Sequence, residues 1–341
     1  MKINLCFTLL MLMLMLNFGL AQNNHIINKE STSFNIKGKK DSINFIVVDN
    51  NINSKKPIFL WCQGSLPVPL YINFKKDGLW MIGGGISNFD YQEIKKYYHL
   101  VVITMPKTPL IVDETRVNKS YFYYGNSDNQ NVPSIEFQKE DFLDNYVDRA
   151  ITVLKFLSKQ KWVDNSKLVV AGHSQGSKVA VGVASKYKKV TKLGLFSANP
   201  FGRIDQNIRK YRKDAELGII SWEIADKKIE NEYHYFRDAN DISFRDTNPN
   251  LISWYSFSKP QLKELLDFNK PIYLAYATGD VASDLCDLVP LYFIQEQKKN
   301  LTYHRYLNME HNFFEINNGN VDHNKPHWKE VMSAFVKWTI E

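Results

Sequence analysis

Ser174 lies at the centre of Gly172-His173-Ser174-Gln175-Gly176, a Gly-x-Ser-x-Gly pattern. The pattern follows an apolar run of strand length (167–171) and opens a stretch rich in Val and Ala (176–185). A serine at such a strand-to-helix turn is held in a strained conformation above the sheet edge, and the flanking glycines leave room for it. The helix N-terminus also favours developing negative charge. We therefore predict that Ser174 is a nucleophile; an ordinary turn with a capping serine is the alternative.

A serine hydroxyl needs a base that takes its proton and an acid that orients the base. His311 follows the last predicted strand, in a loop that can reach back to Ser174. Asp280 directly follows an apolar strand-like run, and Asp284 and Asp287 come shortly after it. We expect Asp280 to be the acid, although any of the three could instead cap the helix that follows. The order Ser, Asp, His along the chain is the one typical of a nucleophile on this kind of turn.

Acyl transfer builds negative charge on an oxygen, which backbone N–H groups can stabilise. One donor should be the N–H of Gln175, the residue after the predicted nucleophile. The other should come from the loop after an early strand, where the apolar run 57–62 leads into Gln63-Gly64-Ser65. We expect Gly64 to let the chain turn closely enough to present the Ser65 N–H; a plain turn is the alternative.

Apolar runs of strand length alternate with longer stretches of helical period along the chain. The predicted strands are residues 42–48, 57–62, 100–105, 167–171, 193–196, 272–276 and 302–307, which ends the series. The predicted helices are residues 137–157, 176–185, 285–297 and 327–340. This alternation predicts an α/β fold with a mostly parallel central sheet covered by helices on both faces. Ligands bind such a sheet outside the carboxyl ends of its strands.

Residues 201–268 interrupt the alternation, because this stretch is long, charged and rich in aromatic residues. A structureless loop of that length is rare in a compact domain. We therefore predict an inserted, largely helical cap between two strands of the core.

Together these residues resemble the α/β-hydrolase superfamily over roughly residues 57–340. The cap falls where that fold often carries one. The positions that match its nucleophile, acid, base and two oxyanion donors are, in that order, Ser174, Asp280, His311, Ser65 and Gln175. The early loop departs from the superfamily, since it reads Gln-Gly-Ser where a His-Gly pair is common. The resemblance identifies no subfamily.

The N-terminus predicts an export signal. Lys2 precedes a mostly apolar run over residues 5–20, and Gly19-Leu20-Ala21 offers the small residues that a signal peptidase needs. We predict a signal peptide over 1–21 and a hydrolase domain over 22–341, periplasmic or secreted and without a stable membrane span. An uncleaved anchor is the alternative, which the short run and its interruption at Asn17 disfavour.

Composition narrows the partners and cofactors. The net charge of the 341 residues is +7, with Lys and Arg spread along the chain rather than clustered, which argues against nucleic acid. Because the sequence lacks zinc-type Cys/His spacing and a GxxxxGK phosphate loop, we expect neither a metal nor a cofactor. Beyond the predicted signal, Cys62 and Cys286 could form one disulfide or remain two buried thiols.

These observations predict a serine hydrolase that cleaves a small-molecule or peptide acyl substrate, an ester rather than an amide, through an acyl-enzyme on Ser174. Two alternatives stay open. One is a peptidase or acyltransferase with the same triad, and the other is a non-catalytic binding protein on a hydrolase scaffold.

Overall fold

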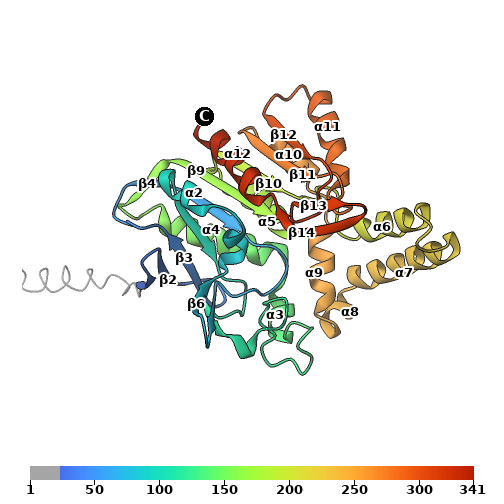
Figure 1. Cartoon of the computed structure of the whole chain (residues 1–341), viewed down its shortest axis with the longest axis horizontal. Helices are drawn as coiled ribbons and strands as arrows, with labels where there is room; N and C mark the ends of the chain where they lie inside the picture. The colour runs from blue at the N-terminus through green and yellow to red at the C-terminus, as the bar shows by residue number, and fades with distance from the viewer. Residues whose placement is uncertain (1–23) are drawn as a thin grey trace, which may run out of the picture.

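The computed structural model describes residues 24–341, and the predicted signal peptide lies outside them. A nine-stranded sheet with the order β1-β2-β3-β7-β4-β9-β10-β11-β12 runs through the molecule (Figure 1). Its strands are β1 (Asn24–Asn28), β2 (Ser31–Lys37), β3 (Ser42–Val48), β4 (Lys56–Cys62), β7 (His99–Ile103), β9 (Val163–His173), β10 (Lys192–Phe196), β11 (Ile272–Ala277) and β12 (Leu301–Tyr306). From β7 to β12 in this order neighbouring strands pair parallel, whereas β1, β2, β3 and β7 pair antiparallel. The predicted mostly parallel sheet is confirmed.

Helices cover both faces of this sheet, as predicted. Along β4, Leu60 packs into one apolar core and Trp61 into the other, because successive side chains of a strand point to opposite faces. The first core contains buried residues of α4 (Leu143–Leu157), α5 (Gln175–Lys186) and α11 (Val289–Gln295). The second contains those of α2 (Tyr91–Tyr97) and α12 (Trp328–Ile340). A strand buried on both faces explains the continuous apolar runs in the sequence.

Two predicted helices are each split. The prediction of one helix over 137–157 is wrong, because α3 (Ile135–Glu140) ends before Asp141 and α4 starts after the extended Phe142. The buried Asp141 carboxylate accepts hydrogen bonds from the Tyr146 hydroxyl (2.8 Å) and the Gln175 amide (3.1 Å), contacts that apolar periodicity does not report. The predicted helix over 285–297 is a 3-10 turn, η3 (Asp284–Leu288), followed by α11, whose first turn contains Pro290.

Several short elements were not predicted, including β1 and β2. A three-stranded sheet contains β5 (Tyr71–Phe74), β6 (Gly78–Met81) and β8 (Ile111–Asp113), accompanied by the 3-10 turns η1 (Gly83–Asn88) and η2 (Glu114–Arg116). A hairpin of β13 (Phe314–Asn317) and β14 (Asn320–Pro326) follows β12, so β12 ends the central sheet but not the series of strands. These strands either have only three or four residues or, like β1, β2 and β14, are rich in polar residues. They therefore lack the apolar run that marks the predicted strands.

The chain between β10 and β11 is largely helical, as predicted. It contains α6 (Asp205–Glu216), α7 (Trp222–Asn240), α8 (Ile242–Thr247), α9 (Asn250–Phe257) and α10 (Leu262–Asp267). Helices α6, α7 and α8 extend sideways from the end of the sheet (Figure 1). In contrast, Phe257 and Leu265 belong to the apolar core beneath, so the far end of the predicted insertion packs with the central sheet.

Cys62 and Cys286 are both buried and unpaired, so the alternative with two buried thiols holds. Burial raises the pKa of the Cys62 thiol to about 12, which keeps it protonated and unreactive. Within residues 24–341, no helix has the length and apolar character needed to cross a membrane.

Candidate active site

Ser174 stands between β9 and α5 with the backbone angles φ 55° and ψ −125°. This is a positive φ in a residue other than glycine, which costs free energy and persists only where the surroundings impose it. Two hydrogen bonds of the Ser174 backbone hold this conformation. The Ser174 N–H donates to the Phe196 carbonyl (2.9 Å), and the Ser174 carbonyl accepts from the Ser177 hydroxyl (2.6 Å). The turn therefore has the strained geometry that the sequence pattern predicts.

Both glycines of the pattern are required by packing. A Cβ on Gly172 would lie 2.2 Å from the Gly176 carbonyl oxygen, and one on Gly176 would lie 2.1 Å from the Cys62 carbonyl oxygen. These are backbone atoms that cannot move aside as a flexible side chain can. The start of α5 is thus packed directly against β9 and the end of β4.

His311 and Asp280 form a pair at the same edge of the sheet. The ring Nδ1 of His311 lies 2.7 Å from Oδ2 of Asp280, which is only 5% exposed. The Asp280 carboxylate also accepts from the Ser283 hydroxyl (2.6 Å) and the Ala282 N–H (2.9 Å). Burial alone would raise the pKa of Asp280, but the hydrogen bond and charge of His311 outweigh it, so the pKa is lowered and the carboxylate stays ionised.

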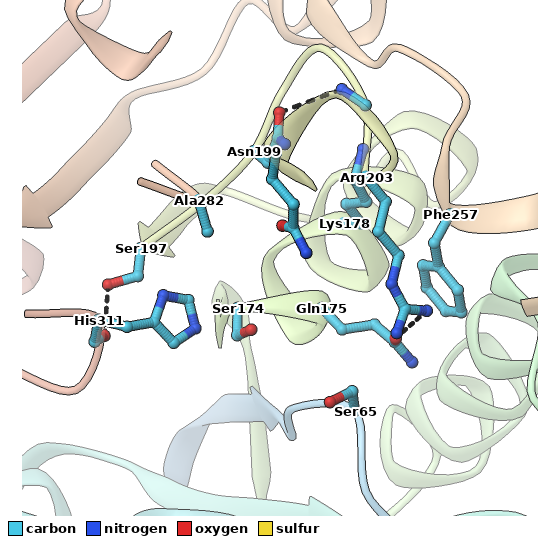
Figure 2. A pocket seen from close by; sticks show the side chains of 12 residues that line it. Ser65, Ser174, Gln175, Lys178, Ser197, Asn199, Arg203, Phe257, Ala282 and His311 are labelled. Carbon is cyan, nitrogen blue, oxygen red and sulfur yellow. Dashed lines mark hydrogen bonds between the residues drawn. The ribbon is translucent and has the colours of Figure 1, made fainter. Parts of the chain in front are cut away.

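The pair also sets the protonation of His311. Burial alone would lower the pKa of its imidazole, yet the hydrogen bond to Asp280 and its charge raise that pKa above the usual value. In the neutral ring the proton stays on Nδ1 and is donated in a hydrogen bond to Asp280, because an ionised carboxylate can only accept. The other ring nitrogen, Nε2, is then unprotonated and can act as a base. His311 and Ser174 line one cavity, and the imidazole points toward Ser174 (Figure 2).

The two alternative acids have other partners. Asp284 forms an ion pair with Arg209 of α6, and Asp287 accepts a hydrogen bond from the Tyr276 hydroxyl (2.7 Å). Of the three acids considered from the sequence, only Asp280 hydrogen-bonds to His311. Its role as the acid remains a prediction that this geometry supports.

Two polar residues, whose role the sequence did not reveal, donate hydrogen bonds to the backbone of His311. The His311 carbonyl accepts hydrogen bonds from Nε2 of His173 (3.0 Å) and from the Ser197 hydroxyl (2.8 Å). Burial lowers the pKa of His173 to about 3, so its ring is neutral at physiological pH. His173 therefore positions His311 rather than exchanging protons. No local pattern links residues so far apart in the chain.

The predicted oxyanion donors Ser65 and Gln175 line the same cavity as Ser174. Across the residues that the structure describes, neither backbone N–H donates to another protein group. Gly64 differs from the expectation, because its φ is not positive and a Cβ there would meet no atom within 4 Å. The turn does not need this glycine, and the space beside it belongs to an open cleft.

Two cavities meet at Ser174 and His311. One, of about 100 Å³, lies on the side of residues 202–206 and Phe257 and is lined mostly by polar side chains. The other is a cleft of about 630 Å³ with apolar walls that include Leu66, Trp80 and Tyr121. A group placed on Ser174 can therefore extend in two directions, into a small polar space and a larger apolar one.

Within the described part of the chain, no three His, Cys, Asp or Glu side chains cluster in a way that could hold a metal ion.

Comparison with known proteins shows the fold. No protein-family model and no curated protein matches the sequence. Among solved structures, an esterase from Pyrococcus furiosus is 13% identical, has a TM-score of 0.51 and covers 91% of this chain and 91% of its own. An acylaminoacyl peptidase from Pyrococcus horikoshii is 12% identical, with a TM-score of 0.52, over 96% of this chain and 43% of its own. The chain thus has the α/β-hydrolase fold, as its sequence suggested.

Proposed function

We propose that this protein is a serine hydrolase that cleaves a carboxylic ester through an acyl-enzyme on Ser174. The observation that carries the proposal is the convergence, at one cavity, of a strained serine and a histidine paired with a buried carboxylate. That arrangement supplies the nucleophile and the base, and two backbone N–H groups supply the oxyanion donors. The esterase among the structural neighbours agrees with this reaction class.

In the first half of the reaction, the Ser174 oxygen attacks the ester carbonyl carbon while Nε2 of His311 takes the hydroxyl proton. The carbonyl oxygen gains negative charge and accepts hydrogen bonds from the N–H groups of Ser65 and Gln175. When the ester C–O bond breaks, His311 returns the proton to the departing alcohol. The acyl group is left on Ser174.

In the second half, water takes the place of the alcohol. His311 removes a proton from the water as its oxygen attacks the acyl carbon, and then returns a proton to Ser174 as the acid is released. Asp280 stays ionised throughout and stabilises the imidazolium that forms in each half. No step requires a group beyond these side chains and backbone amides.

The test is hydrolysis of a short-chain aryl ester by Ser174→Ala. We expect kcat to fall by about 10⁶-fold, because the acyl-enzyme can no longer form. Ser185→Ala is the matched control, since it makes the same change at the far end of α5, away from the cavity. Activity of Ser174→Ala close to that of the wild type would disprove the proposal.

A panel of substrates separates the related activities. Release of an aryl alcohol from esters, without cleavage of aminoacyl amides or transfer to added alcohols, is expected for an esterase. A peptidase would cleave the amides, and an acyltransferase would form new esters.

We further propose that the protein is exported and that the mature chain is a single hydrolase domain starting near residue 22. N-terminal sequencing of the protein recovered from a secreting host is expected to begin at Gln22. Recovery of the full chain from the membrane fraction would instead support the uncleaved anchor.

A further inference from the structure

Of the residues that the structure describes, two with positively charged side chains and none with an acidic side chain line the small cavity beside Ser174. Lys178 of α5 and Arg203, just before α6, line it, whereas its other walls are neutral or belong to His311. Figure 2 shows both cationic side chains on the same side of Ser174. A cavity with this charge distribution favours an anionic group.

Lys178 is buried without a carboxylate partner. The residue is 4% exposed, and among the described residues its ammonium donates only to the Lys259 carbonyl, at 3.3 Å. No carboxylate of the described chain lies within 4.0 Å of this ammonium, although almost every buried charge in proteins is paired. Burial lowers the pKa of Lys178 to about 8, so the ammonium still predominates at neutral pH.

Among residues 24–341, Arg203 also has no ion-pair partner. Its Nη1 donates to the Ser253 hydroxyl (2.8 Å) and to the side-chain oxygen of Gln175 (3.2 Å), and its guanidinium lies over the Trp254 ring at 4.3 Å. A guanidinium has five N–H donors, so these contacts leave some unused. Neutral hydrogen bonds and an aromatic face hold the group in place without cancelling its charge.

The nearest acids bond elsewhere. Asp141 accepts from Tyr146 and Gln175 and does not line the cavity, and Asp205 is paired with Arg209 at 2.8 Å. The charges of Asp205 and Glu264 act on Lys178, and that of Asp141 acts on Arg203, but none of these three acids lines the cavity.

We propose that this cavity binds a carboxylate, so that the preferred substrate carries a short acyl chain ending in a carboxylate. The inference rests on the proposed ester hydrolysis at Ser174. Lys178 and Arg203 would form charge-assisted hydrogen bonds with the terminal carboxylate, while the acyl carbonyl lies against the Ser65 and Gln175 N–H groups.

The acyl part of the substrate is assigned to this cavity because the alcohol part must leave the site before the acyl part does. After the first step the acyl group stays bonded to Ser174, whereas the alcohol departs and water enters. The cleft of about 630 Å³ gives the alcohol room to leave, and the cavity of about 100 Å³ suits a short chain that remains. The apolar walls of the cleft then contact the alcohol part.

The experiment compares 4-nitrophenyl monoglutarate with 4-nitrophenyl pentanoate, which have acyl chains of equal length ending in a carboxylate or a methyl group. We expect wild-type kcat/KM to be about tenfold or more higher for the monoglutarate, since a charge-assisted hydrogen bond in a buried site is worth at least that factor. Equal kcat/KM values for the two esters, or a higher value for the pentanoate, would overturn the proposal from the wild-type protein alone.

Variants then identify the residues. Lys178→Gln is expected to remove most of the preference, measured as the ratio of the two kcat/KM values, and Lys178→Arg to restore part of it. Lys186→Gln is the matched control, because Lys186 lies on the same helix but is exposed and paired with Asp144. A preference that survives in Lys178→Gln would contradict the assignment.

Two further outcomes are distinguishable. If the enzyme prefers the carboxylate on the alcohol part, as in butyrate esters of 4-hydroxybenzoate, the placement of the acyl group is wrong. If neither ester is hydrolysed and Ser174 does not react with a fluorophosphonate, the ester hydrolysis itself fails rather than the carboxylate site.

Discussion

The edge of the sheet that carries Ser174 and the projecting helices α6 to α8 are built in different ways. At the edge, Gly172 and Gly176 leave no room for a single additional carbon atom, and the Asp280 carboxylate has three hydrogen-bond donors. Positions here are determined by backbone packing. A side chain held in this way is preorganised for a reaction.

The projecting helices have little of this packing. The residues of α6, α7 and α8 that are buried are Ala215, Ala225 and Ala239. Large apolar side chains such as Trp222, Ile242 and Phe244 are exposed there. The comparison indicates that the chemistry depends on the sheet edge. The insertion contacts this edge through Arg203 and Phe257, which line the small cavity, and through the ion pair of Arg209 with Asp284.

The largest difference is expected between two neighbouring acids. Asp280→Asn should lower kcat for an aryl ester by about 10⁴-fold, because an amide at this place favours the wrong tautomer of His311. Asp284→Asn is the matched control and should change kcat less than about threefold, since it removes only a partly exposed ion pair with Arg209. Similar losses of kcat in the two variants would contradict the distinction between the edge, where Asp280 contacts His311, and the insertion, where Arg209 contacts Asp284.

Two glycines extend the comparison to packing. Gly176→Ala places a methyl group against the Cys62 and Gln63 carbonyls, so we expect kcat/KM to fall by about 10²-fold and the free energy of unfolding by about 1–3 kcal/mol. Gly218 lies between α6 and α7, with a positive φ and open space around it. Gly218→Ala should therefore cost about 1 kcal/mol of stability and leave kcat/KM intact. Denaturant unfolding and ester kinetics measure both, and an unaffected Gly176→Ala would contradict the packing argument.

The dependence of ester hydrolysis on pH tests the His311–Asp280 pair at the edge. His311 must be neutral to act as base, so activity should fall as the pH drops through its pKa, which Asp280 raises above the ordinary value of about 6.5. Loss of the carboxylate charge in Asp280→Asn lowers this pKa, and the acid limb of the residual activity should move to lower pH. A limb that stays in place would mean that another group titrates. The limb of Asp284→Asn should match that of the wild type.

The smallest effect is expected at the far end of the insertion. Trp222→Ser changes an exposed residue at the start of α7, so kcat/KM should stay within about twofold and the unfolding free energy within about 0.5 kcal/mol. A large loss of activity in this variant would show that the projecting helices reach the site in a way that their exposure does not indicate.

Much of the edge could be predicted from the sequence, because its signals are local. The turn at Ser174 lies between a buried strand and a tightly packed helix, and each leaves a pattern in consecutive residues. The positions of Asp280 and His311 follow from strand ends, since the carboxyl ends of parallel strands meet at one edge. The signal peptide, in contrast, stays a prediction.

Other features depend on contacts between distant residues. The hydrogen bonds of His173 and Ser197 to the His311 carbonyl, and the positive wall formed by Lys178 and Arg203, arise only when separate elements come together. The break at Asp141 has the same cause, because its hydrogen-bond partners Tyr146 and Gln175 lie on α4 and α5. Periodicity reports which face of an element is apolar, but not which polar groups meet across elements.

The account depends most directly on the reactivity of the Ser174 hydroxyl group. Labelling with a fluorophosphonate probe, followed by peptide mass mapping, measures this reactivity before any substrate is known. We expect one phosphonyl group per chain, on the peptide that contains Ser174, and no labelling of Ser174→Ala or of heat-unfolded protein. An unlabelled Ser174 in the folded protein, or a label on another residue, would contradict the account.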